Sequence, residues 1–178
     1  MLRELGSQNR ELHQSALKEL FACLLHQGTV SEATSLAVPF LFELLAAPST
    51  RDRNWVAFLL ASIGVGKSYL EIHTGIDEER WRQILSGRGT SLEAERLSEA
   101  RVLRNVHDEL GRNLHLLLPF LRDGQSEIRA AIARALGRHP NQHATALPAL
   151  EAALTNETAA DAFEAINEAV AALRGGPP

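Results

Sequence analysis

Apolar side chains recur at intervals of three and four residues along most of the chain, and no segment alternates apolar and polar residues over a sustained stretch. The first spacing places apolar side chains on one side of an α-helix, whereas a half-buried strand needs alternation. Stripes of this kind comprise Leu17, Leu20, Phe21, Leu24 and Leu25; Val56, Leu59, Leu60 and Ile63; Ile128, Ile132, Ala135 and Leu136; and Phe163, Ile166, Val170 and Leu173. The sequence therefore predicts an all-α protein whose core these residues build.

Turn and capping residues divide the stripes into separate helices. Gly28 is a helix terminator, and residues 29–32 read as a capping box that opens the next helix. A second capping box at residues 90–93 opens a long helix, which Gly111 or Pro119 is expected to bend. Residues 67–90 have a different composition, with mixed charge and several glycines, and we expect an irregular connector with one short helix at 77–85.

Composition limits the class of protein. At 178 residues the chain is long enough for one domain with a sizeable core, so we expect a single domain over residues 1–178. The net charge of −4 argues against general nucleic-acid binding, which needs clustered Lys and Arg. The chain shows no leader segment and no long apolar run, so we expect a cytoplasmic protein. Cys23 is the only cysteine and lies in an apolar run, which predicts a buried side chain.

Three stretches suggest internal repetition. They are AVPFLFELLAAPSTRDRNWVAFLLASIG, LLLPFLRDGQSEIRAAIARALG and ALPALEAALTNETAADAFEAINEAVAAL. Each pairs a proline-containing apolar helix with a second amphipathic helix through a short turn. Successive helix pairs of this kind are typical of a short α-solenoid of antiparallel pairs.

Two segments resemble HEAT repeats. DGQSEIRAAIARALG looks like the second half of such a repeat, at Asp123, Ile128, Arg129, Ala130, Ala131, Ala135 and Leu136. HQGTVSEATSLAVPFL, residues 26–41, resembles the opening of a group of small bacterial HEAT-repeat proteins. The resemblance implies a HEAT-like solenoid in which Asp123 and Arg129 brace neighbouring turns. It covers most of the chain and is weak between residues 67 and 100.

The segment IGVGKS, residues 63–68, ends like a phosphate-binding loop. Such a loop needs a glycine at the position of Ala61, and it should join a buried strand to a helix. The preceding residues form a helical stripe instead. We interpret the segment as a helix C-terminus with Lys67 near its negative end, and we expect no nucleotide cofactor.

Metal-binding and catalytic motifs are absent from the sequence. His139 and His143 are separated by Pro140, which interrupts a helix, and His107 and His115 are too far apart around a helix to act together. There is no His-Glu-x-x-His motif and no Gly-x-Ser-x-Gly motif. We therefore expect a protein without enzymatic activity, metal or cofactor.

Between Pro140 and Leu173 the chain holds five acidic residues and no lysine or arginine. They are Glu151, Glu157, Asp161, Glu164 and Glu168. The last four follow helical spacing, so several of them are expected on one side of a helix. Such a surface is either simply solvated or a site for a basic partner.

Trp81 stands between Arg80 and Arg82 in the connector. It either pins the connector to the core or anchors an interface, because Trp and Arg are enriched at binding hot spots. The candidate partner-binding residues are therefore Trp81 and the four acids Glu157, Asp161, Glu164 and Glu168.

Protein binding is the function that these features favour, since a solenoid offers an extended surface and few deep pockets. The resemblance to small bacterial HEAT-repeat proteins suggests an immunity protein that neutralises a cognate toxin, with a basic toxin domain as the partner. One alternative is a regulatory scaffold or assembly factor. Another is a nucleic-acid binder of the HEAT-like DNA glycosylase kind, whose groove would use Arg122, Arg129, Arg134 and Arg138.

Overall fold

The computed structural model describes residue 5 and residues 9–175. Its helices are α1 (Arg10–Leu24), α2 (Glu32–Ala46), α3 (Arg53–Ile63), α4 (Tyr69–Ile72), α5 (Glu78–Gly87), α6 (Leu92–Asn113), the 3₁₀ helix η2 (Leu114–Arg122), α7 (Ser126–Gly137), the 3₁₀ helix η3 (Pro140–Gln142), α8 (His143–Leu154) and α9 (Ala160–Arg174). The described residues contain isolated β-bridges but no strand, which confirms the all-α prediction.

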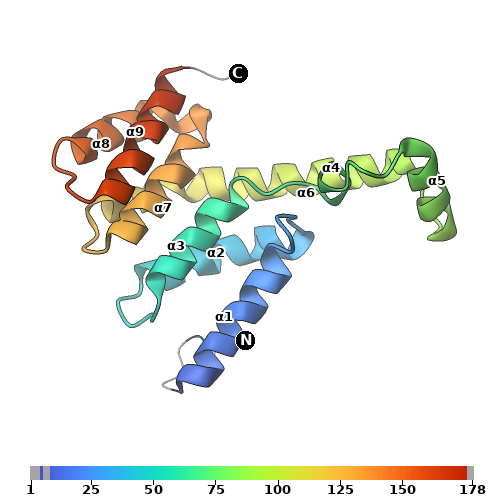
Figure 1. Ribbon diagram of the computed structural model, residues 1–178, viewed down its shortest axis with the longest axis horizontal. Coiled ribbons are helices and arrows are strands. Elements are labelled where there is room, and N and C mark those ends of the chain that lie inside the picture. The colour runs from blue at the N-terminus through green and yellow to red at the C-terminus, as the bar shows by residue number, and fades with distance from the viewer. Residues whose placement is uncertain (1–4, 6–8, 176–178) are drawn as a thin grey trace.

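The helices form two layers. In one layer α3 packs on α7 and α7 packs on α9, and α1 lies beside α3 (Figure 1). We call α1, α3, α7 and α9 the α3 layer. The second layer contains α2, the C-terminal part of α6 with η2, and α8, and it packs on the first through α2–α3, η2–α7 and α8–α9 contacts. The protein is a short α-solenoid of antiparallel helix pairs.

The core lies between the two layers. Its largest fully buried side chains include Leu41 and Leu45 of α2, Leu60 of α3, and Ile128 and Ile132 of α7. The predicted α3 and α7 stripes are buried throughout. Each such side chain contributes about 1.5–3 kcal/mol when it is removed from water, so these stripes fix which side of each helix faces inward.

Two predicted core residues lie at the surface instead. Phe163 is 47% exposed, because the buried side of α9 is carried largely by small residues at other positions, among them Ala162 and Ala165. Cys23 is also exposed, since Leu20 and Leu24 occupy the inward side of α1.

Helix α9 approaches α7 closely at Gly137. A Cβ atom added to Gly137 would lie 2.8 Å from both Cα and Cβ of Ala169. Only glycine accommodates this approach without a shift, which explains why small residues line the contact between the two helices.

A series of ion pairs joins successive repeats. In each pair an arginine or histidine side chain of one α3-layer helix reaches an acid in the turn before the next helix of that layer. The pairs are His13–Asp52 at 3.1 Å, Arg53–Asp123 at 2.9 Å and Arg129–Glu157 at 2.6 Å. Arg129 Nη1 also donates to the backbone oxygen of Asp123 at 2.7 Å. The expectation that Asp123 and Arg129 brace neighbouring turns is therefore confirmed.

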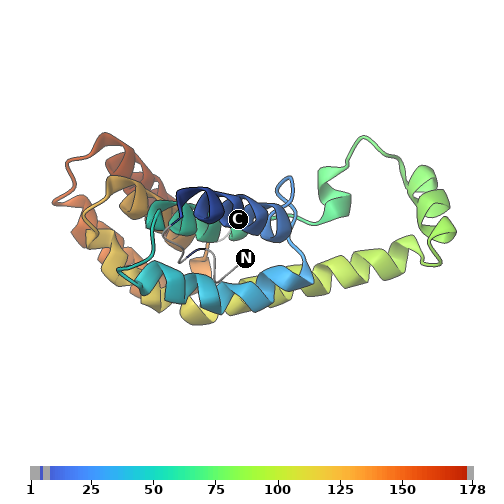
Figure 2. The ribbon, with the colours of Figure 1, turned by 90° about the horizontal axis from the view of Figure 1, so that it is seen from below.

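Residues 67–105 project from this body, and we call them the arm. Helices α4 and α5 and the first part of α6 lie beyond the end of the solenoid (Figure 2). The arm has its own small hydrophobic cluster of Trp81, Leu85 and Leu92, with Leu70, Ile76 and Ile84 against it. The short helix expected at 77–85 is α5, which Asp77 caps by accepting from Arg80 N at 2.8 Å.

The base of the arm is held to the loop after α1. Lys67 N donates to Gly28 O at 2.9 Å, and Val30 N donates to Lys67 O at 3.1 Å. Gly64 caps α3 by donating to Leu60 O at 3.2 Å, so the interpretation of IGVGKS as a helix C-terminus is confirmed. The Lys67 ammonium pairs with Glu71 at 3.0 Å rather than with the end of α3.

Helix α6 connects the arm with the body. Ser91 caps it by accepting from Ala94 N at 3.1 Å, and the helix runs without interruption to Asn113. It then tightens into η2, which contains Pro119, so the change falls between the two expected bend positions. Within the described parts of the chain, none of the helices combines the length and apolarity needed to cross a bilayer.

Candidate functional site

Three aromatic side chains meet on the outward surface of the α3 layer. The ring of Phe21 on α1 lies 6.1 Å from Trp55 and 6.2 Å from Phe58, and the rings of Trp55 and Phe58 on α3 are 6.0 Å apart. Trp55 and Phe58 are each 48% exposed, while Phe21 is partly buried. We call these three residues the aromatic cluster. Exposed apolar groups that touch one another commonly mark an interaction surface.

The helical register of α3 explains why the cluster is outside the core. Val56, Leu59 and Leu60 occupy its inward side, so Trp55 and Phe58, three residues apart, fall on the other side. This is the position where a solvated helix ordinarily carries polar residues. Two large aromatic residues there have no role in the core.

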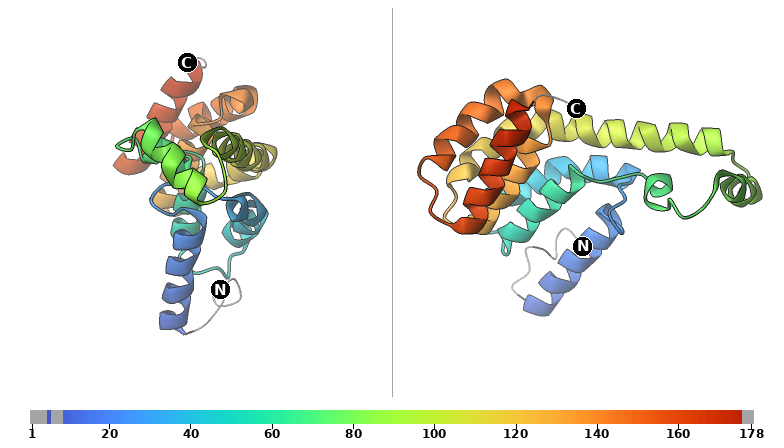
Figure 3. Two further views of the ribbon diagram at one scale, coloured as in Figure 1. Left: turned by 90° about the vertical axis from the view of Figure 1, so that its right-hand side faces the viewer. Right: turned by 45° about the horizontal axis from the view of Figure 1, so that its top comes forward.

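The cluster stands between two hollows. One hollow, of about 460 Å³, lies between α1 and α3 and includes Phe21 and Trp55 in its wall. The other, of about 520 Å³, lies over α7 between α3 and α9 and includes Phe58. We call the second the α7 hollow. Figure 3 shows α3, α7 and α9 side by side at the end of the molecule opposite the arm.

The α7 hollow has an apolar floor and charged walls. Small side chains of α7 and α9, among them Ala131, Ala165 and Ala172, form the floor. Arg134 and Arg138 of α7 and Glu168 of α9 line the walls. The ion pairs found among the described residues include none of these three side chains, so the hollow carries a net positive charge.

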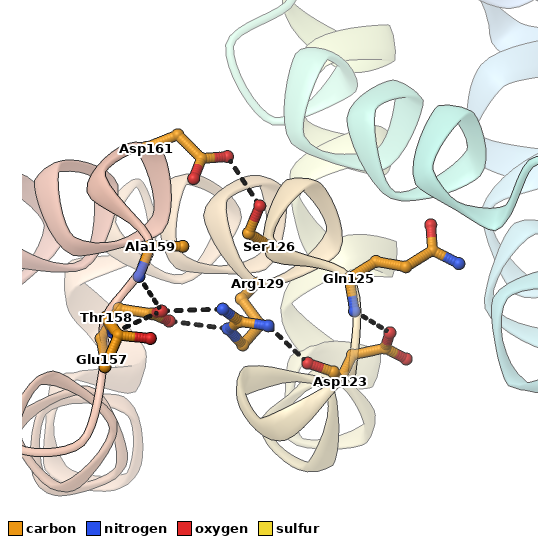
Figure 4. Close-up of polar contacts among 8 residues, drawn as sticks. All are labelled: Asp123, Gln125, Ser126, Arg129, Glu157, Thr158, Ala159 and Asp161. Atoms are coloured by element: carbon orange, nitrogen blue, oxygen red, sulfur yellow. Dashed lines mark hydrogen bonds and ion pairs between the residues drawn. The ribbon is translucent and has the colours of Figure 1, made fainter.

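The acids of the predicted acidic surface do not share one environment in the structure. Glu157 is not on α9 but in the turn before it, and its side chain is 3% exposed. Arg129 binds both carboxylate oxygens at 2.6 and 2.7 Å, and the backbone N–H groups of Thr158 and Ala159 donate to the same carboxylate (Figure 4). Arg129 first, with these backbone donors, lowers the pKa of Glu157 to about 2 against the cost of burial.

The premise that the acidic run lacks cationic partners is wrong for two of its members. Arg129, from outside the run, neutralises Glu157, and Arg174 pairs with Glu151 at 2.6 Å. Asp161 accepts a hydrogen bond from Ser126 Oγ at 3.2 Å, while Glu164 and Glu168 are exposed. Glu168 borders the α7 hollow, so this exposed acid of α9 lies on the same surface as the aromatic cluster.

Trp81 lies within the arm. It is 6% exposed, and its ring contacts Tyr69 and His73 with centroid distances of 6.0 and 6.3 Å. The residue pins the connector to the arm's own cluster rather than to the main core, and little of the ring is accessible to a partner.

The four arginines of the nucleic-acid alternative do not form one groove. Arg122 and Arg129 border a different hollow together with Asp123 and Glu157. The carboxylate of Glu157 and the backbone oxygen of Asp123 both accept hydrogen bonds from Arg129. Only Arg134 and Arg138 lie in the α7 hollow, because they follow the outward side of α7 one turn apart.

The histidines are dispersed, apart from one contact. His139 is buried, and its ring centroid is 5.8 Å from that of His107. Burial and then the nearby His107 lower the pKa of His139 to about 4, so the imidazole is neutral at pH 7. In the part of the chain that the structure describes, no group of three or more His, Cys, Asp or Glu side chains is placed to hold a metal ion.

Sequence reasoning missed the aromatic cluster and named Trp81, not Trp55, as the candidate partner-binding tryptophan. A signal was present: Trp55 and Phe58 are bulky residues on the side of α3 opposite its apolar stripe. The pairing of Phe21 with them joins different helices and could not be read from spacing.

No protein-family model matches this chain, and no curated protein matches it. Among solved structures, it is similar to a designed armadillo repeat protein, with a TM-score of 0.30 and 16% sequence identity over 97% of this chain and 98% of that one. This likeness is too low to carry an argument, so the assignment to the α-solenoids depends on the packing of the helices themselves.

Proposed function

We propose that this chain is a non-enzymatic protein-binding module and that the outward surface of the α3 layer is its docking site. The observation that carries the proposal is the exposed aromatic cluster between two hollows. An aromatic side chain buries 150–250 Å² when it is fully covered, so covering the exposed half of Trp55 or Phe58 contributes roughly 2–3 kcal/mol. Tryptophan is also the residue type most enriched at binding hot spots.

The chain offers a matched pair of variants for testing this site. Phe58 is 48% exposed on α3, and Phe40 is 50% exposed on α2 in the other layer. After a partner has been co-purified from native lysate and identified, its affinity is measured by calorimetry for Phe58→Ala, Trp55→Ala and Phe40→Ala. We expect the first two to weaken binding about 10- to 100-fold, in keeping with hot-spot truncations, and the third to leave it unchanged. Equal loss with Phe40→Ala and Phe58→Ala would remove the α3 layer as the site.

The exposed acids of α9 supply the second part of the docking surface. Asp161, Glu164 and Glu168 are exposed on α9, and Glu168 lines the α7 hollow, so these acids fit a partner with a basic surface. Glu157 is excluded from this role because Arg129 holds it. Such charges mainly raise the association rate at low salt. Replacing all three by lysine is expected to slow association while leaving helicity intact, as measured across a salt series. Unchanged association at low salt would show these acids to be only solvated.

The finer description is a cytoplasmic immunity protein of the HEAT-repeat type, whose partner is a basic toxin domain. The Asp123–Arg129 brace supports the repeat type, and the acids of α9 suit a basic cleft. A regulatory scaffold is the alternative. The two are separated by co-expressing this chain with the C-terminal domain encoded by the neighbouring reading frame. Growth rescue by the wild type and not by Trp55→Ala supports immunity, and failure of rescue by the wild type favours the scaffold.

A further inference from the structure

We propose that the α7 hollow receives an acidic side chain of the protein partner, next to the apolar side chain that covers the aromatic cluster. This inference depends on the docking site proposed above and specifies the chemistry of its occupant. The partner's docking segment then carries an apolar residue for Phe58 and Trp55, followed by a carboxylate for Arg134 and Arg138.

The two arginines point to this ligand through their placement. Arg134 lies in the last turn of α7, and Arg138 is the C-cap residue directly after that helix. Both line the α7 hollow, and the described residues place no acid within ion-pair distance of either. Arg129 on the same helix has its carboxylate within the chain, in Glu157. Two cations that line one hollow repel each other, and an anion between them relieves this repulsion.

A carboxylate fits this position better than other groups. A guanidinium binds a carboxylate through two parallel hydrogen bonds, as Arg129 does with Glu157 at 2.6 and 2.7 Å. The hollow also borders Phe58, so an acidic residue close in sequence to an apolar anchor reaches both. Glu168 lines the same hollow and makes no ion pair with the arginines, so both guanidinium groups are open to a carboxylate of the partner.

A polyanion such as nucleic acid is disfavoured at the same position. Glu168 lines the hollow, Asp161 and Glu164 are exposed on the same helix, and the net charge of the chain is −4. A phosphate backbone gains affinity by neutralising many phosphates with Lys and Arg, and only two arginines line this hollow. Arg134 and Arg138 line the hollow from the α7 side, and Glu168 lines it from α9. A protein segment with one acid, and basic residues beyond it, therefore matches these charges.

The experiment uses short random peptides displayed on phage and selected on the full chain. Synthetic versions of the enriched peptides are then measured by fluorescence anisotropy. The test variant is Arg134→Glu with Arg138→Glu. The control is Arg80→Glu with Arg88→Glu, which changes the charge equally at two exposed arginines of the arm. We expect peptides with an acidic residue close to an apolar one, binding at least 10-fold more weakly to the test variant and unchanged to the control. Exchanging the peptide acid for lysine should restore binding to the test variant.

Each contrary outcome has a defined meaning. Peptides that lose affinity with Phe58→Ala but ignore Arg134→Glu with Arg138→Glu overturn this inference and leave the docking site standing. Peptides that ignore Phe58→Ala as well overturn the docking site itself. No enrichment of acidic peptides, or a gel shift of single-stranded DNA that depends on Arg134 and Arg138, also overturns the inference.

Discussion

The solenoid body and the arm are both helical, yet different forces hold them. In the body, long apolar side chains from two layers interlock, and ion pairs such as Arg53–Asp123 join one repeat to the next. In the arm, the cluster has three buried side chains with three partly buried ones against them, and ion pairs such as Arg82–Glu78 and Arg96–Glu78 are exposed. Helix content alone therefore says little about which region is stable, because tertiary packing rather than helix propensity supplies most of the stability of a helix in a protein.

Local interactions compensate in part for the small hydrophobic cluster of the arm. Asp77 caps α5, Arg82 pairs with Glu78 at 2.9 Å, and Glu99 accepts from Leu70 N at 3.2 Å. Solvent screens exposed pairs of this kind, so together they do not replace a core. The arm therefore depends on α6, which continues into the body, and on the backbone bonds of Lys67 to Gly28 and Val30.

The largest expected effect is in the body core. Ile128→Asp places a carboxylate at a fully buried position of α7, and an unpaired buried charge is among the most costly changes known. We expect a loss of more than about 4 kcal/mol, which unfolds the protein or its C-terminal half. Thermal denaturation by circular dichroism measures this. An unchanged transition would contradict the assignment of the α7 stripe.

The ion pair between repeats should give the next largest effect. Glu157→Gln leaves Arg129 without its anion, and breaking a largely buried pair costs about 3 kcal/mol. The same pair predicts the pH dependence. The folded-state pKa of Glu157 is lowered to about 2, so its stabilisation is complete above the unfolded value near 4.5 and is lost as the pH falls toward 2.

Two controls isolate the contribution of Glu157. Glu168→Gln removes an exposed acid of the same layer and should change the free energy of unfolding little. The pKa of His139 is lowered to about 4 in the folded protein. The stabilisation that the neutral imidazole gives the fold is therefore lost as the pH falls from the unfolded value near 6.5 toward 4, which begins at a higher pH than the loss due to Glu157. A Glu157→Gln variant with the wild-type acid profile below pH 4.5 would contradict the assignment.

Removing the central side chain of the arm cluster should destabilise the arm while leaving the solenoid body intact. Trp81→Ala empties a site that Leu85 and Leu92 cannot fill, and large-to-small changes of this kind cost about 3–5 kcal/mol in a well-packed core. We expect amides of α4 and α5 to lose hydrogen-exchange protection while those of α7 and α9 keep it. A matching loss in α7 would show that the two regions unfold together.

The smallest expected effect concerns an exposed link between arm and body. Arg101 of α6 pairs with Glu32 of α2 at 2.8 Å, and both side chains are exposed. Arg101→Ala should lower the free energy of unfolding by no more than about 0.5–1 kcal/mol, and less at high salt. Urea denaturation at two salt concentrations measures this. A larger loss would mean that the pair helps to fix the arm.

The sequence was most informative where the apolar residues of a single helix define which side of that helix is buried. Val56, Leu59 and Leu60 were recognised because their spacing alone defines the inward side of α3. Phe163 was misplaced because the alanines of α9, which pack closely on α7, carry too weak an apolar signal to set the register.

Contacts between helices could not be predicted in the same way. Arg129 and Glu157 are far apart in the sequence, so nothing in the acidic run showed that one of its members is buried and paired. The aromatic cluster likewise joins α1 to α3. The candidate site is therefore a product of packing, whereas the fold class follows from periodicity.

Helix α6 belongs to both regions, so it can transmit movement from one to the other. Leu92 is buried in the arm cluster and Val106 in the body core, and the helix between them rises by about 21 Å at 1.5 Å per residue. A rigid rod of that length works as a lever. Turning its base by roughly 10° at Val106 displaces its far end by about 4 Å, so a small repacking of the body becomes a movement of atomic diameter at the tip of the arm.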